Sequence, residues 1–274
     1  MKAILIVLRK EVQEGLRNRW VLATTLLLAA LALTLTFLGS APTGDVGAGA
    51  LDVVIVSLSS LTIFLVPLIA LLISHDAIAG EMERGTMPLL LSYPVGRWQV
   101  LVGKFLGHLA ILSFATTLGY GAAALALGAT GTVIDAASGS AFLSMIASSI
   151  MLGAVFVAIG YLVSAVVRER STAGGVAIGV WLFFVLIYDM ALLGMLVVDQ
   201  GRTVTADLLN VFLLLNPTDA YRLLNLGGHA GALSGMGGAV DSATLGPATL
   251  LAALALWIVV PLSAATLIFT RKEL

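Results

Sequence analysis

The residues from Glu81 to Thr86 place acidic, basic and flexible positions side by side in a chain that is otherwise almost wholly apolar. Glu81 and Glu83 stand two positions apart, Arg84 follows, and Gly85 and Thr86 close the stretch. Carboxylates and a guanidinium at this spacing can form charge-assisted hydrogen bonds with a partner protein. Burying each charge in lipid would cost about 2.5–3.5 kcal/mol, so we expect the stretch to project from the membrane.

Another acidic residue, Asp189, lies beside Tyr188 inside a long apolar segment. A carboxylate within a membrane span is by default a candidate for a transport pathway. The position is also close to the outer end of its segment, where the side chain could simply reach water. Both interpretations of Asp189 stay open at this point.

The chain offers few ligands for a soft metal such as copper(I), which prefers thiolates, thioethers and imidazoles. It has no Cys, eight Met and three His. Neither Met-x-x-Met nor His-x-His occurs, and we interpret the Met residues of the apolar segments as core filler. We therefore expect no metal site in this chain.

Nucleotide binding is not indicated either, because no G-x-x-x-x-G-K-[ST] loop occurs. The one Gly-Lys pair, at Gly103 and Lys104, is followed by Phe105 and lacks the hydroxyl that holds Mg²⁺. An intramembrane enzyme would need paired acids or a His/Asp constellation within the spans, and Asp189 stands alone there. We expect no catalytic residue and no cofactor bound by this chain.

The elements that position these residues follow from composition. Of 274 residues 59% are hydrophobic and 11% charged, and the mean hydropathy is +1.08. Soluble domains carry about a quarter charged residues, so this is an integral membrane protein. The net charge of -1 gives no basic field for nucleic acid. Six apolar stretches are long enough for transmembrane helices in one domain over 1–274, at about 20–38, 53–74, 101–127, 142–167, 172–198 and 248–270.

Orientation follows from Lys and Arg, which are retained on the cytoplasmic side of short loops. Five precede the first span, three lie between the second span and the first turn of the third, two between the fourth and fifth, and two follow the sixth, which accounts for twelve of the 14. We therefore expect both termini in the cytoplasm and a multi-pass membrane protein. The segments 39–52, 128–140 and 199–247 are expected outside.

The stretch 75–85 is expected to form a short helix at the inner surface. Asp76 can cap its start, and Gly85 tolerates the left-handed conformation that ends a helix. One interpretation is a solvated loop whose charges snorkel from the membrane. The other is a rigid lever between two spans, which a cytoplasmic partner can push.

The residues "GEMERGTMPLLLSYPVGRWQVLVGKF" resemble the signature of type 2 ABC transporter permeases. The sequence departs from that signature at Met82, where a basic or polar residue is usual, and Arg84 supplies the charge. The resemblance implies a permease subunit that forms a homodimer and receives work from cytoplasmic ABC ATPase subunits, which bind ATP and Mg. The positions that match are Glu81, Glu83, Gly85, Thr86, Pro94, Arg97, Gly103 and Lys104. The residues expected to contact the ATPase are Glu81, Glu83, Arg84, Gly85, Thr86, Arg168, Glu169 and Arg170.

The N-terminal residues 2–19 have apolar positions at helical spacing, with basic residues between them. This pattern predicts an amphipathic helix that lies at the membrane interface and contacts lipid. Pairs of small residues four apart recur in the spans, at Gly103 and Gly107, at Gly160 and Ser164, and at Gly175 and Gly179. Each pair lets two helices approach closely, either within one subunit or at a dimer seam.

The last outer segment contains an apolar helix at about 206–215 that is too short to span. The residues after it are interpreted as a re-entrant lid or as a docking surface for a periplasmic protein, and they are Asn216, Pro217, Asp219, Tyr221 and Arg222. The stretch "LLLNPTDAYRLLNL" at 213–226 resembles the permeases that serve maturation of nitrous oxide reductase. That resemblance implies a multi-pass protein of the bacterial inner membrane, a periplasmic maturation protein as partner, and assembly of a copper-sulfide centre.

The expected fold is therefore all-α and polytopic, with six transmembrane helices, an N-terminal interfacial helix, a cytoplasmic coupling helix and an external re-entrant or interfacial segment before the last span. The expected function is ATP-driven export or force transmission for copper-site maturation. The alternative is a generic type 2 exporter of lipid, drug or polysaccharide, which would respond to lipophilic substrates and need no periplasmic partner. A passive scaffold would show no dependence on nucleotide.

Overall fold

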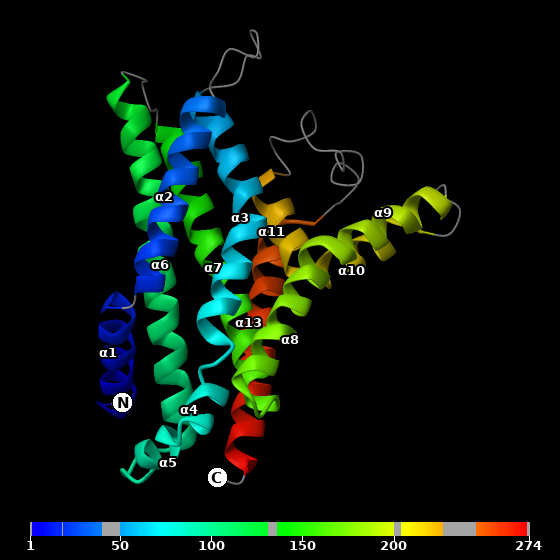
Figure 1. Cartoon of the computed structure of the whole chain (residues 1–274). Helices are drawn as coiled ribbons and strands as arrows, with labels where there is room; N and C mark the ends of the chain where they lie inside the picture. The colour runs from blue at the N-terminus through cyan, green and yellow to red at the C-terminus, as the bar shows by residue number, and fades with distance from the viewer. Residues whose placement is uncertain are drawn as a thin grey trace.

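A computed structural model describes residues 2–17, 19–39, 50–130, 136–199, 204–226 and 245–272. Within these ranges the regular structure is entirely helical, which confirms the all-α prediction (Figure 1). The elements are α1 (Lys2–Arg17), α2 (Arg19–Gly39), α3 (Ala50–Ser74), α4 (Ala79–Glu83), α5 (Thr86–Leu91), α6 (Arg97–Ala129), α7 (Ala136–Val166), α8 (Arg170–Leu182), η1 (Phe183–Ile187), α9 (Tyr188–Asp199), α10 (Ala206–Leu214), α11 (Pro217–Leu226) and α13 (Pro247–Arg271).

Five of the six predicted spans fall on helices that are long and apolar enough to cross a membrane. Five such stretches occur in the described residues, and a sixth is present if the bent pair α1 and α2 is counted as one span. Predicted spans 1 to 4 correspond to α2, α3, α6 and α7, the fifth to α8, η1 and α9 together, and the sixth to α13. The structure thus confirms a polytopic membrane protein.

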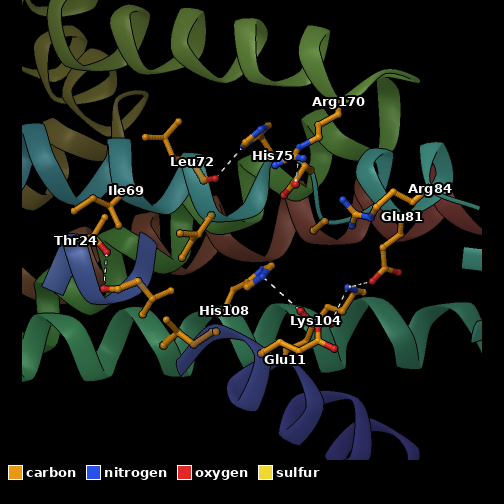
Figure 2. Close-up of a pocket in the computed structure, with 17 residues that line it drawn as sticks. Glu11, Thr24, Ile69, Leu72, His75, Glu81, Arg84, Lys104, His108 and Arg170 are labelled. Atoms are coloured by element: carbon orange, nitrogen blue, oxygen red, sulfur yellow. Dashed lines mark hydrogen bonds and ion pairs between the residues drawn. The ribbon is translucent and has the colours of Figure 1, made fainter. Parts of the chain in front are cut away.

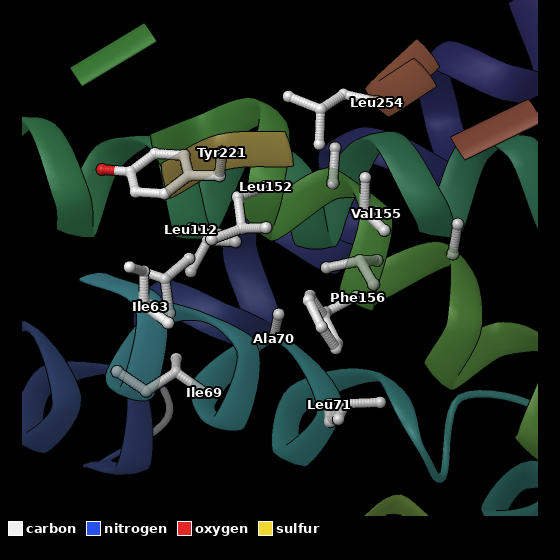
Figure 3. Packing of buried hydrophobic residues seen from close by; sticks show 14 of the residues in the cluster. Ile63, Ile69, Ala70, Leu71, Leu112, Leu152, Val155, Phe156, Tyr221 and Leu254 are labelled. Atoms are coloured by element: carbon white, nitrogen blue, oxygen red, sulfur yellow. The ribbon is translucent and has the colours of Figure 1, made fainter. Parts of the chain in front are cut away.

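Helix α7 is the centre of the bundle and packs mainly against α3 and α13. Buried residues make up 72% of its most apolar stretch, compared with 17% for α13, so α7 is shielded from lipid on most sides. Figure 3 shows Leu152, Val155 and Phe156 of α7 among apolar side chains of α3 and α6. Because α7 contacts most of the bundle, it can hold elements at both ends of the membrane.

The ends of the bundle differ in what they carry. Figure 1 shows α1, α4, α5 and the end of α13 together at one end, and the end of α6 with the start of α7 at the other. We name the first the inner end, because the distribution of Lys and Arg assigns it to the cytoplasm, and the second the outer end. Helices α8, η1 and α9 lean away from the bundle toward the outer end, with α10 beside α9.

Helix α1 packs along α6, and the glycine pair of α6 explains how closely. A Cβ atom placed on Gly103 would lie 2.8 Å from the Cβ atom of Val7, and one on Gly107 would lie 2.5 Å from the Cβ atom of Glu11. These distances are shorter than real carbon contacts, so both positions need glycine. This pair therefore serves packing within one subunit, and α1 meets the first span at an angle of 67°.

The other small-residue pairs differ in their surroundings. A Cβ atom on Gly160 of α7 would overlap Ser74 Oγ of α3, so this glycine also serves packing within the subunit. Among the described residues, no atom lies within 4 Å of a Cβ atom placed on Gly175 or Gly179 of α8. Within that part of the chain, nothing covers this face of α8.

Candidate functional site

The predicted short helix at the inner end is α4, which begins against a hydroxyl of the central helix. Ser164 Oγ of α7 accepts hydrogen bonds from the backbone N–H groups of Ile78, at 2.9 Å, and of Ala79, at 3.0 Å. The prediction that Asp76 caps this helix is wrong, because no side chain of its own segment caps α4. Asp76 instead binds the Arg170 guanidinium, with Oδ2 3.0 Å from Nε. A charged partner gives the carboxylate a stronger hydrogen bond than a backbone N–H group would.

The end of α4 is formed as the sequence predicts. Gly85 has a φ of 69°, in the left-handed region that favours glycine, and α5 begins at the next residue. Thr86 Oγ1 donates to the Glu81 carbonyl at 3.2 Å. The turn between α4 and α5 is thereby fixed by one backbone conformation and one side-chain hydrogen bond.

Glu81 differs from expectation, because its side chain points into the protein and not into the cytoplasm. It is 8% exposed, and its Oε1 lies 2.7 Å from Lys104 Nζ of α6. Lys104 is 3% exposed and also binds Glu11 Oε1 of α1 at 2.8 Å. Figure 2 shows Lys104 between the two carboxylates. A glutamate can be buried here because an ammonium group compensates its charge.

The remaining predicted coupling residues are exposed and lie on adjoining turns. Glu83 Oε2 accepts from the Arg170 backbone N–H at 2.9 Å, which places the end of α4 against the start of α8. A shallow groove of about 500 Å³ beside them is lined by Met82, Glu83, Arg168 and Lys272. We name the exposed set the coupling face, and it consists of Glu83, Arg84, Gly85, Thr86, Arg168, Glu169 and Arg170.

A larger pocket of about 560 Å³ lies behind α4, between α1, α3 and α6 (Figure 2). His108 lines it, with Nδ1 2.9 Å from the Tyr161 hydroxyl and Nε2 3.6 Å from Glu11 Oε2. His75 also lines it, and its Nδ1 lies 3.0 Å from the Leu72 carbonyl oxygen. Among the described residues no three His, Asp or Glu side chains are arranged to hold a metal ion. His229 lies outside those residues.

At the outer end the structure joins Asp189 to the predicted lid residues. Arg222 of α11 donates from Nη2 to Asp189 Oδ2 at 2.6 Å, and from Nη1 to Asp219 Oδ1. Asn216 Nδ2 donates to Asp219 Oδ2 at 3.0 Å and to Asp189 Oδ1 at 3.3 Å. Asp189 is thus part of an ion-paired cluster. Burial and the neighbouring Asp189 carboxylate outweigh the Arg222 guanidinium and raise the pKa of Asp219 to about 7.

The irregular turn η1 completes this outer cluster. A π-helical turn leaves a carbonyl without its usual partner along the helix. The Phe184 carbonyl in η1 accepts from Asn216 Nδ2 and from Thr218 Oγ1, both at 3.1 Å. Tyr221 is fully buried, and its hydroxyl lies 2.9 Å from Ser149 Oγ of α7. Helix α11, which begins at Pro217, is therefore packed into the bundle by polar contacts.

Sequence reasoning missed two residues at the inner end. In the sequence Ser164 stands out only as a small residue, and Glu11 is one polar position of α1. The spacing of Gly103 and Gly107 was the available signal, since it marks the face of α6 that receives another helix. Nothing in the sequence specifies that α1 is that helix.

Comparison with known proteins agrees with this architecture. Residues 5–274 match the family model described as ABC-2 family transporter protein. The chain is 46% identical over 278 residues to a protein of Pseudomonas aeruginosa named "Probable ABC transporter permease protein NosY", with 100% of both chains covered. A protein of the same name from Stutzerimonas stutzeri is 46% identical over 275 residues, which is 99% of each chain. The chain therefore belongs to the ABC-2 family of transporter proteins.

Proposed function

We propose that this permease subunit transmits work from a separate ATPase across the bacterial inner membrane for maturation of the copper-sulfide centre of nitrous oxide reductase. As a member of the ABC-2 family, it is a multi-pass permease subunit of an ABC transporter. The maturation role is supported by the stretch 213–226 and by the name that the two relatives share. ATP and Mg belong to the ATPase in this proposal.

One observation carries the mechanical part of the proposal. Helix α4 is attached to three spans, while its coupling face is exposed at the inner end. Ser164 of α7 holds its start, Lys104 of α6 holds Glu81, and the α8 backbone binds Glu83. A solvated loop would not be fixed in this way. A force applied to the coupling face would therefore reach α6, α7 and α8 together.

The homodimer and the periplasmic partner complete the proposal. The open face of Gly175 and Gly179 on α8 is available for a second copy of the chain, because small residues permit close helix contact. At the outer end α10 carries the exposed residues on which a periplasmic maturation protein would act, whereas Asn216, Asp219 and Tyr221 are buried in the single chain. Whether α11 closes a pathway or supports that partner stays a prediction.

The test uses the permease purified with its ATPase and the host's nitrous oxide reductase as the reporter. Replacing Glu83 and Arg84 together with Ala should leave the permease in the membrane but separate ATP hydrolysis from the copper content of the reductase. A matched control replaces Glu14 and Arg17, an exposed acid and base of α1. Unchanged ATPase binding, hydrolysis and copper content in the first variant would refute the lever.

A second experiment tests the role in maturation of nitrous oxide reductase. Cells without this permease should make nitrous oxide reductase that lacks its copper-sulfide centre. A fully loaded reductase in those cells would refute the maturation role. Export of a labelled lipid, drug or polysaccharide that depends on the permease would then support the generic exporter.

A further inference from the structure

The buried ammonium group of Lys104 connects two helices that are far apart in the sequence. Its Nζ lies 2.8 Å from Glu11 Oε1 of α1 and 2.7 Å from Glu81 Oε1 of α4. All three residues are less than 9% exposed. Lys104 thus binds the coupling helix on one side and the N-terminal helix on the other (Figure 2).

The charges of this cluster favour a single connected unit. Two carboxylates face one buried ammonium group, and Lys10 supplies a second positive charge at 3.8 Å from the Oε1 atoms of both Glu11 and Glu81. Lys10 is 44% exposed, so it closes the cluster toward water. Separating α1 from α4 would leave a buried charge without its partner, which is strongly unfavourable.

Packing holds α1 against the same helix that carries Lys104. The backbone of α1 approaches α6 over Gly103 and Gly107, one position before and three after Lys104. Farther along α1, Gly15 lies against Ile111 of α6. Helix α1 therefore has close steric contact with α6 along its length, and the ion cluster adds a link to α4 that packing alone does not provide.

We propose that Lys104 is a positioning residue that makes α1 move together with α4 when the ATPase engages the coupling face. In this proposal α1 is a moving part of the transporter that passes displacement to α2, in addition to being an anchor at the membrane interface. The inference rests on the proposed lever function of α4. It adds a second route for the motion, besides the direct connections of α4 to α7 and α8.

The absence of Cys from the chain allows the motion to be measured with spin labels at introduced cysteines. Gln13 reports on α1. Ser92, which follows α5, reports on the segment formed by α4 and α5, and both residues are exposed. Each is paired with Val259, which is 57% exposed on α13. The complex with the ATPase is assembled with excess unlabelled permease so that distances arise within one chain. Distances are compared with and without a non-hydrolysable ATP analogue.

In the parent protein both label pairs should change distance on addition of the analogue. Lys104→Met should abolish the change at Gln13 and retain the change at Ser92. Because Lys104→Met strands two buried carboxylates, a variant that also carries Glu11→Gln and Glu81→Gln provides the same test without unpaired charge. Lys104→Arg should keep both changes. Arg9→Met, which removes an exposed charge from α1, should also keep both changes.

Two results would overturn the inference alone: a parent in which Ser92 moves and Gln13 does not, or a triple variant in which Gln13 moves as far as in the parent. A parent in which neither label moves would overturn the lever function, and the inference with it. The two failures are therefore distinguishable in one set of measurements.

Discussion

Replacing Ser164 with Ala should loosen the coupling helix without changing any charge. The hydroxyl accepts two backbone hydrogen bonds, from Ile78 and Ala79, and all three residues are at most 1% exposed. A net contribution of about 1 kcal/mol for each bond gives about 2 kcal/mol for the pair. The loss of a capping oxygen at a helix start falls in the same range, at about 0.5–2 kcal/mol. We therefore expect the equilibrium for local opening of α4 to rise about 30-fold, at about 1.4 kcal/mol for each factor of ten.

Hydrogen exchange followed by mass spectrometry measures this opening directly, because amides of a locally unfolding segment exchange through the open form. Peptides that cover 78–84 should exchange about 30-fold faster in Ser164→Ala, while peptides of α7 keep the parent rate. Ser171→Ala provides the control, since this serine is exposed near the same end. Parent-like exchange over 78–84, with α7 still intact, would show that Ser164 does not hold α4.

Three further predictions concern packing and charge elsewhere. Gly160→Ala should lower stability by about 1–3 kcal/mol through overpacking, seen as a lower thermal midpoint. Ser74→Ala in the same chain should restore part of this stability, because it removes the hydroxyl that the new methyl group would overlap. Arg97→Met should lower the free energy of unfolding by about 1–3 kcal/mol, seen as a lower thermal midpoint, because Nη1 donates to three carbonyls at the end of α13. Arg97→Lys should lower the free energy of unfolding less. Since the pKa of Asp219 is raised to about 7, the folded state binds its proton more tightly than the unfolded chain, so this carboxyl stabilises the fold at low pH and its contribution is lost as the pH rises to about 7. Asp219→Asn should remove that fall from the pH dependence of the thermal midpoint, and an unchanged pH profile would contradict the raised pKa.

The spans could be predicted from the sequence because their signal is local. A run of apolar residues long enough to cross the membrane must be helical there, since no water satisfies its backbone groups. The predicted third span, 101–127, lies within α6, and the predicted fourth, 142–167, lies within α7 except for its last residue. The turn at Gly85 was equally predictable, since a left-handed conformation strongly favours glycine.

The partners of the polar side chains could not be predicted, because they depend on how distant helices meet. Asp189 and Arg222 are 33 positions apart, and their contact requires both the π-helical turn in α8–α9 and the docking of α11. Asp76 had a plausible local role as a cap, and a residue on another helix offered a stronger partner. Local capping rules rank only the options within one segment, whereas Arg170 is 94 positions away.

Polar contacts specify which helices are joined in this protein, because lipid solvates apolar helix surfaces about as well as neighbouring helices do. At the inner end the contacts of Ser164, Lys104 and Glu83 join α4 to α7, α6 and α8. At the outer end Arg222 and Asn216 join α11 to the fifth span. The central helix α7 reaches both ends, through Ser164 and through Ser149 on Tyr221. We therefore expect substitutions at the buried polar residues to alter how motion is shared among helices. Substitutions on the coupling face should instead alter whether the ATPase can apply force to the permease.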